Sequence, residues 1–227
     1  MKELLLAGVD LPELTLVETE FQTCGRGQVG NSWESQAGEN LLFSILCHPD
    51  GVKADHQFVL SQAIALTVQQ TLLQYVDDVR VKWPNDIYWQ DKKICGILIE
   101  CTLQGSTVND CIIGVGLNVN QTAFESDAPN PVSLAQIVNL TFNRKAVLDA
   151  IIENFIKYYD RILHGEDISY EYKQNLYRRN GWYKYEEPNG DMFEAKIVDV
   201  LPSGHIVLMD KNEKIREYEF KEVKFVI

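Results

Sequence analysis

The sequence lacks long hydrophobic runs and has few basic residues. No apolar stretch approaches the roughly 18 to 20 residues that cross a bilayer, and the first six residues carry two charges and no small-residue cleavage site. We therefore expect a cytoplasmic chain with no membrane contact. The 21 Lys and Arg residues are outnumbered by 33 Asp and Glu residues, so the net charge is −12. Such a charge repels nucleic acid phosphates, and we expect no DNA partner.

Cysteine pairs and the common catalytic signatures are also missing. The odd number of cysteines, the absence of a CxxC pair and their apolar surroundings predict reduced core thiols. They are Cys24, Cys47, Cys95, Cys101 and Cys111. There is no GxxxxGK[ST] phosphate loop, GxSxG nucleophile elbow or HExxH zinc helix, and the four histidines are scattered. Zinc chemistry and nucleophilic catalysis are therefore disfavoured.

Hydrophobic periodicity predicts an α+β main domain over residues 1–177. Strands are expected at 14–21 and 41–47, and Asp55 offers an N-cap for a helix that runs to about residue 75. Four further strands, at 79–83, 87–89, 93–103 and 108–119, predict an antiparallel meander. Helical spacing returns at 131–139, 145–163 and 168–176. We expect a mixed or antiparallel sheet packed with helices.

The pattern changes after residue 177 to short strands separated by turns. The expected strands are 182–185, 193–201, 205–209 and 215–220, and the turn signals are Pro188-Asn189-Gly190 and Ser203-Gly204. This spacing predicts a small β barrel over residues 178–227. Two domains fit the length of 227 residues.

A glycine-rich stretch at residues 25–30, GRGQVG, matches the GxGxxG string of dinucleotide-binding folds. A polar loop and then a strand follow it, so no helix N-terminus would face a phosphate, and we reject that interpretation. Arg26 among the glycines could instead close over an anionic ligand, because guanidinium suits carboxylate and phosphate oxygens. The alternative is a surface loop with a solvated arginine.

Polar side chains also cluster at strand ends. Lys82, Asn85 and Asp86 lie within five residues of one another, and together they could bind phosphate and Mg²⁺, which needs few protein ligands. A capped turn is as good an explanation of that cluster alone. Lys93 begins a strong apolar strand and Asn118 ends another, so both would border one sheet, although a solvated surface lysine is the default for Lys93.

These stretches together resemble the biotin protein ligases. The matching segments are GRGQVGNSW at residues 25–33, KWPND at 82–86, KKICGILIE at 92–100 and GVGLNVN at 114–120. The match runs in order from about residue 17 to the end, and KWPND followed by the GILIE strand is far more specific than a glycine loop. The resemblance implies a catalytic domain of the class II aminoacyl-tRNA synthetase and biotin ligase type, followed by an SH3-like domain.

The resemblance also implies a reaction. In such enzymes the biotin carboxylate attacks the α-phosphate of ATP, and the resulting biotinyl-5'-AMP passes biotin to a lysine of a biotin carboxyl carrier protein, such as that of acetyl-CoA carboxylase. Lys93 and Arg26 would be catalytic, with Lys93 neutralising charge at the phosphate. Biotin would contact Gln22, Gly25, Arg26, Gly27, Gln28 and Lys93. ATP would contact Trp33, Lys82, Asn85 and Asn118, and Mg²⁺ would bind Asp86.

Two departures from the family pattern keep alternatives open. Gln28, Val29 and Asn31 stand where many members have arginine, which predicts weaker retention of the adenylate. The resemblance implies a strand and a Ser/Thr-Thr-Asn segment that contacts biotin ahead of Met1, so we expect either a start upstream of Met1 or a truncated, weak or dead ligase. We also expect no DNA-binding helix-turn-helix domain. A lipoate or octanoate ligase, disfavoured by KWPND, and a truncated, non-catalytic biotin-binding module are the alternatives. The resemblance is also consistent with a homodimer.

Overall fold

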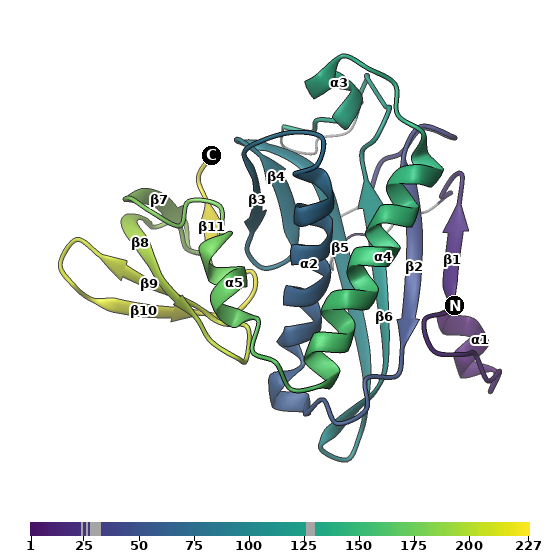
Figure 1. Cartoon of the computed structure of the whole chain (residues 1–227). Coiled ribbons are helices and arrows are strands. Elements are labelled where there is room, and N and C mark those ends of the chain that lie inside the picture. Colours follow the sequence, from purple (N-terminus) through teal and green to yellow (C-terminus); the bar gives the residue numbers. More distant parts are fainter. Residues whose placement is uncertain (24, 26, 28–32, 126–129) are drawn as a thin grey trace.

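The computed structural model contains two sheets. The larger one has six strands in the order β1-β2-β6-β5-β4-β3 (Figure 1). The structure describes residues 1–23, 25, 27, 33–125 and 130–227. The strands are β1 (Leu16–Thr19), β2 (Leu41–Cys47), β3 (Val79–Lys82), β4 (Asp86–Trp89), β5 (Lys92–Gln104) and β6 (Thr107–Leu117). Every neighbouring pair is antiparallel, which confirms the predicted meander from β3 to β6.

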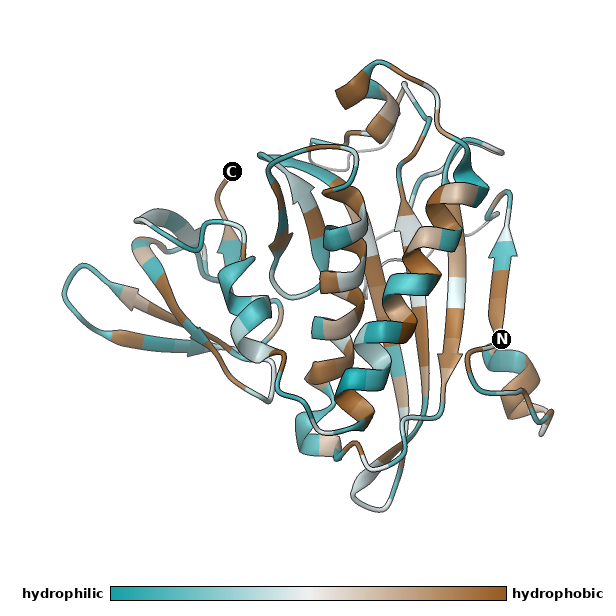
Figure 2. Cartoon of the chain, viewed as in Figure 1, coloured by the Kyte–Doolittle hydropathy of each residue, from teal (hydrophilic) through white to brown (hydrophobic). Residues whose placement is uncertain are grey.

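Two long helices, α2 (Phe58–Leu72) and α4 (Arg144–Leu163), cover one face of this sheet (Figure 1). Strand side chains alternate between faces, so every second residue of β2, β5 and β6 points toward these helices. Figure 2 shows apolar residues of α4 alternating with hydrophilic ones along its length, as expected for a helix with one buried side. The core therefore lies between the sheet and the two helices.

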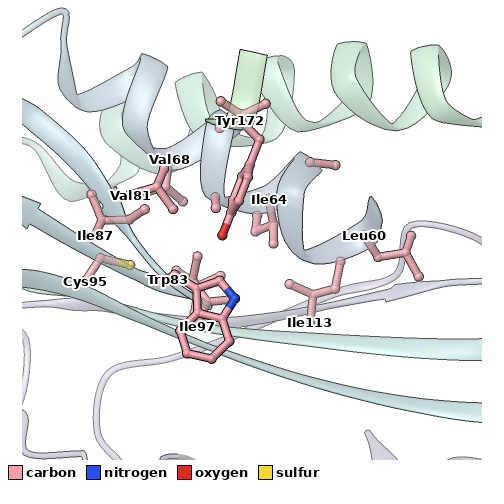
Figure 3. Packing of buried hydrophobic residues seen from close by; sticks show 14 of the residues in the cluster. Leu60, Ile64, Val68, Val81, Trp83, Ile87, Cys95, Ile97, Ile113 and Tyr172 are labelled. Carbon is pink, nitrogen blue, oxygen red and sulfur yellow. The ribbon is translucent and has the colours of Figure 1, made fainter. Parts of the chain in front are cut away.

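Apolar side chains from α2 and from the strands fill the core, as Figure 3 shows. The labelled residues Leu60, Ile64, Val68, Val81, Ile87 and Ile113 are each 0% exposed. Tyr172, on the short helix α5 (Ser169–Gln174), reaches the same core, and its hydroxyl donates to the Pro84 carbonyl at 3.1 Å. Burial of this layer holds α2 and α5 against the strands that carry the polar clusters.

A second, five-stranded sheet follows α5, with order β10-β9-β8-β7-β11. Its strands are β7 (Tyr183–Glu186), β8 (Met192–Val200), β9 (Ile206–Asp210), β10 (Ile215–Tyr218) and β11 (Lys224–Phe225). The chain enters it along the edge of β3, where the Tyr177 amide donates to the Val81 carbonyl at 2.8 Å. The Trp83 indole donates to the Gly204 carbonyl at 2.8 Å and so joins the two sheets. The predicted strands were thus found, whereas β11 was missed.

Two helix starts differ from the prediction. Residues Ala54–His56 form a 3₁₀ turn, η1, so Asp55 is not the N-cap of α2; the N-cap is Gln57, without a side-chain cap bond. The Asp55 carboxylate lies 2.7 Å from His56 Nδ1, a local partner that replaces the predicted cap. Helix α1 (Lys2–Leu6) was not predicted. In α3 (Leu134–Val138), Ser133 and Gln136 form a capping box within the predicted helical segment.

The structure shows no helix, among the residues it describes, that is long and apolar enough to span a bilayer. In the same part of the chain, Cys47, Cys95, Cys101 and Cys111 are free thiols.

His48 fastens the segment before β1 to the sheet. Its Nε2 lies 3.0 Å from the Leu11 carbonyl, and its Nδ1 lies 3.0 Å from Asp110 Oδ1. Both partners are acceptors, so only the doubly protonated ring satisfies both contacts. The pKa of His48 is therefore raised, first by the Leu11 carbonyl and then by Asp110, while burial opposes the shift.

We expect this contact to make stability fall as the pH rises. The pKa of His48 is higher in the folded state. The stabilisation by the protonated ring is therefore complete below the unfolded-state pKa of about 6.5 and is lost as the pH rises past the folded-state pKa. The side chain is 35% exposed, so the loss in free energy of unfolding should stay below about 1 kcal/mol. The free energy of unfolding in urea, measured below the unfolded-state pKa and above the folded-state pKa of His48, should fall in the wild type but not in His48→Gln. Identical pH dependence in both proteins would refute the assignment.

Candidate active site

A cavity of about 1630 Å³ lies on the face of the large sheet that the helices leave free. Its floor is made by alternate residues of the central strands, including Gly96 and Leu98 of β5 and Gly114 and Gly116 of β6. Further walls come from the β3–β4 turn, from Trp33 and from residues 220–227. The structure thus brings the predicted polar clusters to one cavity.

Lys93 and Asp86 form an ion pair in this cavity, with Nζ and Oδ1 2.7 Å apart. Their side chains are only 24% and 21% exposed. A register shift between Ile87 and Tyr88 sets the two strands so that Lys93, near the start of β5, reaches Asp86 at the start of β4. The Lys93 amide also donates to the Asn130 carbonyl at 2.9 Å. The backbone of Lys93 is therefore fixed, and its ammonium is positioned to bind an anion.

Lys82 supplies a second cation to the cavity. Its Nζ lies 5.1 Å from the ring centre of Tyr88 and 5.2 Å from that of Phe225, on β11. Burial lowers the pKa of Lys82, and the nearby Lys93 adds to that effect, whereas Asp86 opposes it. A cation that has lost much of its water gains strongly from an anionic ligand.

The two asparagines are both buried but differ in their partners. Asn85 donates through its amide to the Ile97 carbonyl, and the Ile97 amide donates to the Asn85 carbonyl at 3.1 Å. Asn85 therefore ties the β3–β4 turn to β5. Asn118 donates to the Val132 carbonyl at 3.2 Å, but its Oδ1 has no hydrogen-bond partner among the described residues. A buried acceptor without a partner costs about 1 to 3 kcal/mol. A ligand that donates a hydrogen bond to Asn118 Oδ1 would remove this cost.

The indole of Trp33 lies directly against the glycine floor. A Cβ at Gly116 would meet Trp33 Cε2 at 2.5 Å, and one at Gly96 would meet Cζ3 at 2.9 Å. Lys93 Nζ is 5.7 Å from the indole ring centre, and Trp33 Nε1 is buried without a partner in the described structure. The missing side chains of the two glycines thus let an aromatic platform lie flat on the sheet.

The glycine-rich segment is described only in part. The Trp33 amide donates to the Gly25 carbonyl at 3.0 Å, and a Cβ at Gly25 would meet the Trp33 carbonyl oxygen at 2.3 Å. Only glycine fits this close approach. Gln22 and Gly27 line the cavity. Arg26 and Gln28 lie outside the described residues, so their roles stay predictions.

Several cavity residues were not predicted from the sequence. Lys224 and Phe225 come from β11, a strand of two residues that carries no periodic signal. Lys2 and Glu100 also line the cavity, where their side chains form an ion pair at 2.5 Å. No group of three or more His, Cys, Asp or Glu side chains in the described ranges is placed to hold a metal. Asp86 is thus a single carboxylate, which suits an ion that arrives with a phosphate ligand.

Comparisons with known proteins agree with this architecture. The family model described as Biotin/lipoate A/B protein ligase matches residues 7–118. The bifunctional ligase/repressor BirA of Bacillus spizizenii is 36% identical over 167 residues, which are 70% of this chain and 50% of that protein. The biotin–[acetyl-CoA-carboxylase] ligase of Mycobacterium tuberculosis is 30% identical over 135 residues, 58% of this chain and 48% of that protein. The chain spans about half the length of these relatives.

A similar fold occurs in the biotin protein ligase of Aquifex aeolicus, solved in complex with biotin and ATP. Its TM-score is 0.78 at 23% identity, and the match covers 96% of this chain and 91% of that chain. The predicted fold class, including the second sheet, is confirmed by this likeness.

Adding one methyl group to the floor tests the platform. Gly116→Ala should displace the Trp33 indole, because the new Cβ would lie 2.5 Å from the ring. Gly114→Ala is the matched control, since its Cβ would meet nothing closer than the Leu98 carbonyl oxygen at 3.6 Å. Acrylamide quenching of tryptophan fluorescence should rise in Gly116→Ala only, and a Trp33→Phe background should abolish the difference. Equal quenching in both alanine variants would contradict the contact.

Proposed function

Residues 7–118 form a domain of the biotin/lipoate A/B protein ligase family, and on that premise we propose that the chain is an ATP-dependent, AMP-forming biotin protein ligase. The observation that carries the proposal is the Lys93–Asp86 pair on a helix-free, glycine-floored sheet face. The biotin carboxylate attacks the α-phosphate of ATP, pyrophosphate leaves, and a lysine amine of a carrier protein attacks the acyl carbon of biotinyl-5'-AMP. AMP leaves in the second step.

Lys93 is the residue proposed to act in the adenylation step. Its ammonium binds the biotin carboxylate, orients it toward the α-phosphate and stabilises the negative charge that develops there. The low exposure of the pair strengthens this interaction, because little water screens it. Arg26 is the second proposed catalytic residue, and Gln22, Gly25, Gly27 and Gln28 are the further proposed contacts of biotin.

The nucleotide is proposed to lie beside the Trp33 platform. The adenine stacks on the indole, and Asn118 Oδ1, which has no partner in the described part of the chain, accepts a hydrogen bond from a nucleotide N–H or O–H. Lys82 faces the phosphates as a desolvated cation, while Asn85 acts on the nucleotide site by holding the β3–β4 turn. Mg²⁺, when bound, would neutralise phosphate charge, and Asp86 is the proposed protein ligand.

The partner is proposed to be a biotin carboxyl carrier protein or the carrier domain of a carboxylase, acting in the cytoplasm. We also propose two domains, residues 1–177 and 178–227, since Tyr177 still bonds to Val81 of the large sheet, whereas the strands from β7 onward form a separate sheet. The net charge of −12 argues against DNA or an anionic membrane as a partner. A homodimer stays a prediction.

Biotin-dependent release of pyrophosphate from MgATP tests the function. Lys93→Ala should lower the rate about 10²- to 10³-fold, because one preorganised donor at the developing charge is lost. Lys92→Ala, next to it in sequence but exposed, is the matched control and should retain the wild-type rate. Release with lipoate instead of biotin would show the related ligase, and biotin binding without release would show a binding module. Either result would overturn the proposal.

A further inference from the structure

Three cysteines lie side by side on the neighbouring strands β2, β6 and β5 of the large sheet. Cys47 on β2 is directly opposite Cys111 on β6, and Cys111 is directly opposite Cys101 on β5. Residues opposite each other in a sheet share a face. Their sequence neighbours Glu100 and Ile112 line the substrate cavity, so the cysteines point to the other face, under the helices. The proposed ligase reaction uses none of them.

Strand register makes one of the two cysteine pairs closer than the other. The Asn118 amide donates to the Ile94 carbonyl at 2.9 Å, and the β5–β6 register then continues without a shift to Cys101 and Cys111. Hydrogen-bonded and non-hydrogen-bonded pairs alternate along an antiparallel ladder. Counting from Asn118, Cys101 and Cys111 form a non-hydrogen-bonded pair, for which the Cα separation is about 4.5 Å.

Cys47 and Cys111 form the wider kind of pair. The Leu46 amide donates toward β1, to the Thr15 carbonyl at 2.9 Å, so the amide of Cys47 points toward β6. This places Cys47 and Cys111 in a hydrogen-bonded pair, with Cα atoms about 5.5 Å apart and side chains farther from each other. Because a disulfide needs Cβ atoms about 3.5 to 4.5 Å apart, the Cys101–Cys111 pair fits better.

The members of the closer pair differ in access and in acidity. Cys111 is 0% exposed, whereas Cys101 is partly exposed and borders a groove of about 450 Å³ between the start of α2 and the second sheet. The side-chain interaction with Cys111 lowers the pKa of Cys101. That interaction and burial raise the pKa of Cys111. Cys101 is therefore the attacking thiol and Cys111 the protected one.

We propose that Cys101 and Cys111 form a thiol–disulfide exchange site for a small disulfide such as oxidised glutathione. The Cys101 thiolate attacks one sulfur of the small disulfide, forms a mixed disulfide and releases one thiolate. Cys111 then loses its proton, attacks Cys101 Sγ and displaces the second thiolate. The net change is oxidation of two protein thiols to one cross-strand disulfide, with reduction of one small disulfide to two thiols.

The residues that line the groove explain why a second cysteine would be needed to remove an adduct from Cys101. The walls of the groove include Phe58 and Ser61 of α2 and Gly204 and His205 of the β8–β9 turn. The Trp83–Gly204 hydrogen bond joins that turn to the β3–β4 turn. A bulky adduct on Cys101 would lie between these elements. Attack by Cys111 expels the adduct and leaves a short link between strands that are already paired.

The test uses the full chain with Cys24→Ser as the reference protein, so that every remaining cysteine lies among the described residues. The reduced protein is incubated with oxidised glutathione, trapped with acid and analysed by intact-mass and peptide mass spectrometry. The reference protein should lose two hydrogens and contain a Cys101–Cys111 disulfide. Cys111→Ala and Cys111→Ser should retain a glutathione adduct at Cys101. Cys101→Ser should gain neither the adduct nor the disulfide, and Cys47→Ala should react like the reference.

The proposal is overturned if the disulfide contains Cys47, if the reference protein keeps the adduct on Cys101, or if Cys101→Ser is oxidised as fast as the reference protein. Circular dichroism of each reduced variant confirms folding before oxidation, and Cys101→Ser supplies a variant at a partly exposed position. None of these readouts needs biotin, ATP or turnover. Failure of the ligase proposal would therefore leave this result unaffected.

Discussion

The ion pair between Lys93 and Asp86 is the contact on which the site depends. Each residue stands at the start of a strand, and the register shift between those strands brings the two side chains together. The helices lie on the opposite face, so this pair and the surrounding floor remain open to a ligand while the strands beneath them are packed from behind. A partly buried lysine whose carboxylate partner among the described residues is Asp86 can exchange part of that interaction for an incoming anion.

The second sheet supplies part of the wall of the cavity. Phe225 on β11 lies over Lys82, and Arg178 donates to the Val226 carbonyl at 2.7 Å while its guanidinium lies 4.8 Å from the ring centre of Tyr183. These contacts hold the last residues of the chain against the β3–β4 turn. The burial that lowers the pKa of Lys82 is therefore linked to the docking of two sheets that are separate in sequence.

Local sequence patterns predicted most of the fold, since the apolar runs of β2, β5 and β6 and the apolar stripe of α4 each lie within one segment. They also brought Lys82, Asp86, Lys93 and Asn118 to one sheet. Features that depend on distant segments were not predictable in this way. Neither the contact of Trp33 with Gly116 nor the β11 wall has a local signal. The Asp55 cap was wrong because His56 offered a nearer partner.

A crystal structure with a non-hydrolysable biotinyl-adenylate analogue would test the central claim most directly. The analogue should occupy the helix-free face, with its acyl phosphate mimic beside Lys93, its adenine on the Trp33 indole and a donor within hydrogen-bond distance of Asn118 Oδ1. An analogue bound on the helix-covered side of the sheet, or on the second sheet away from Lys93, would contradict it.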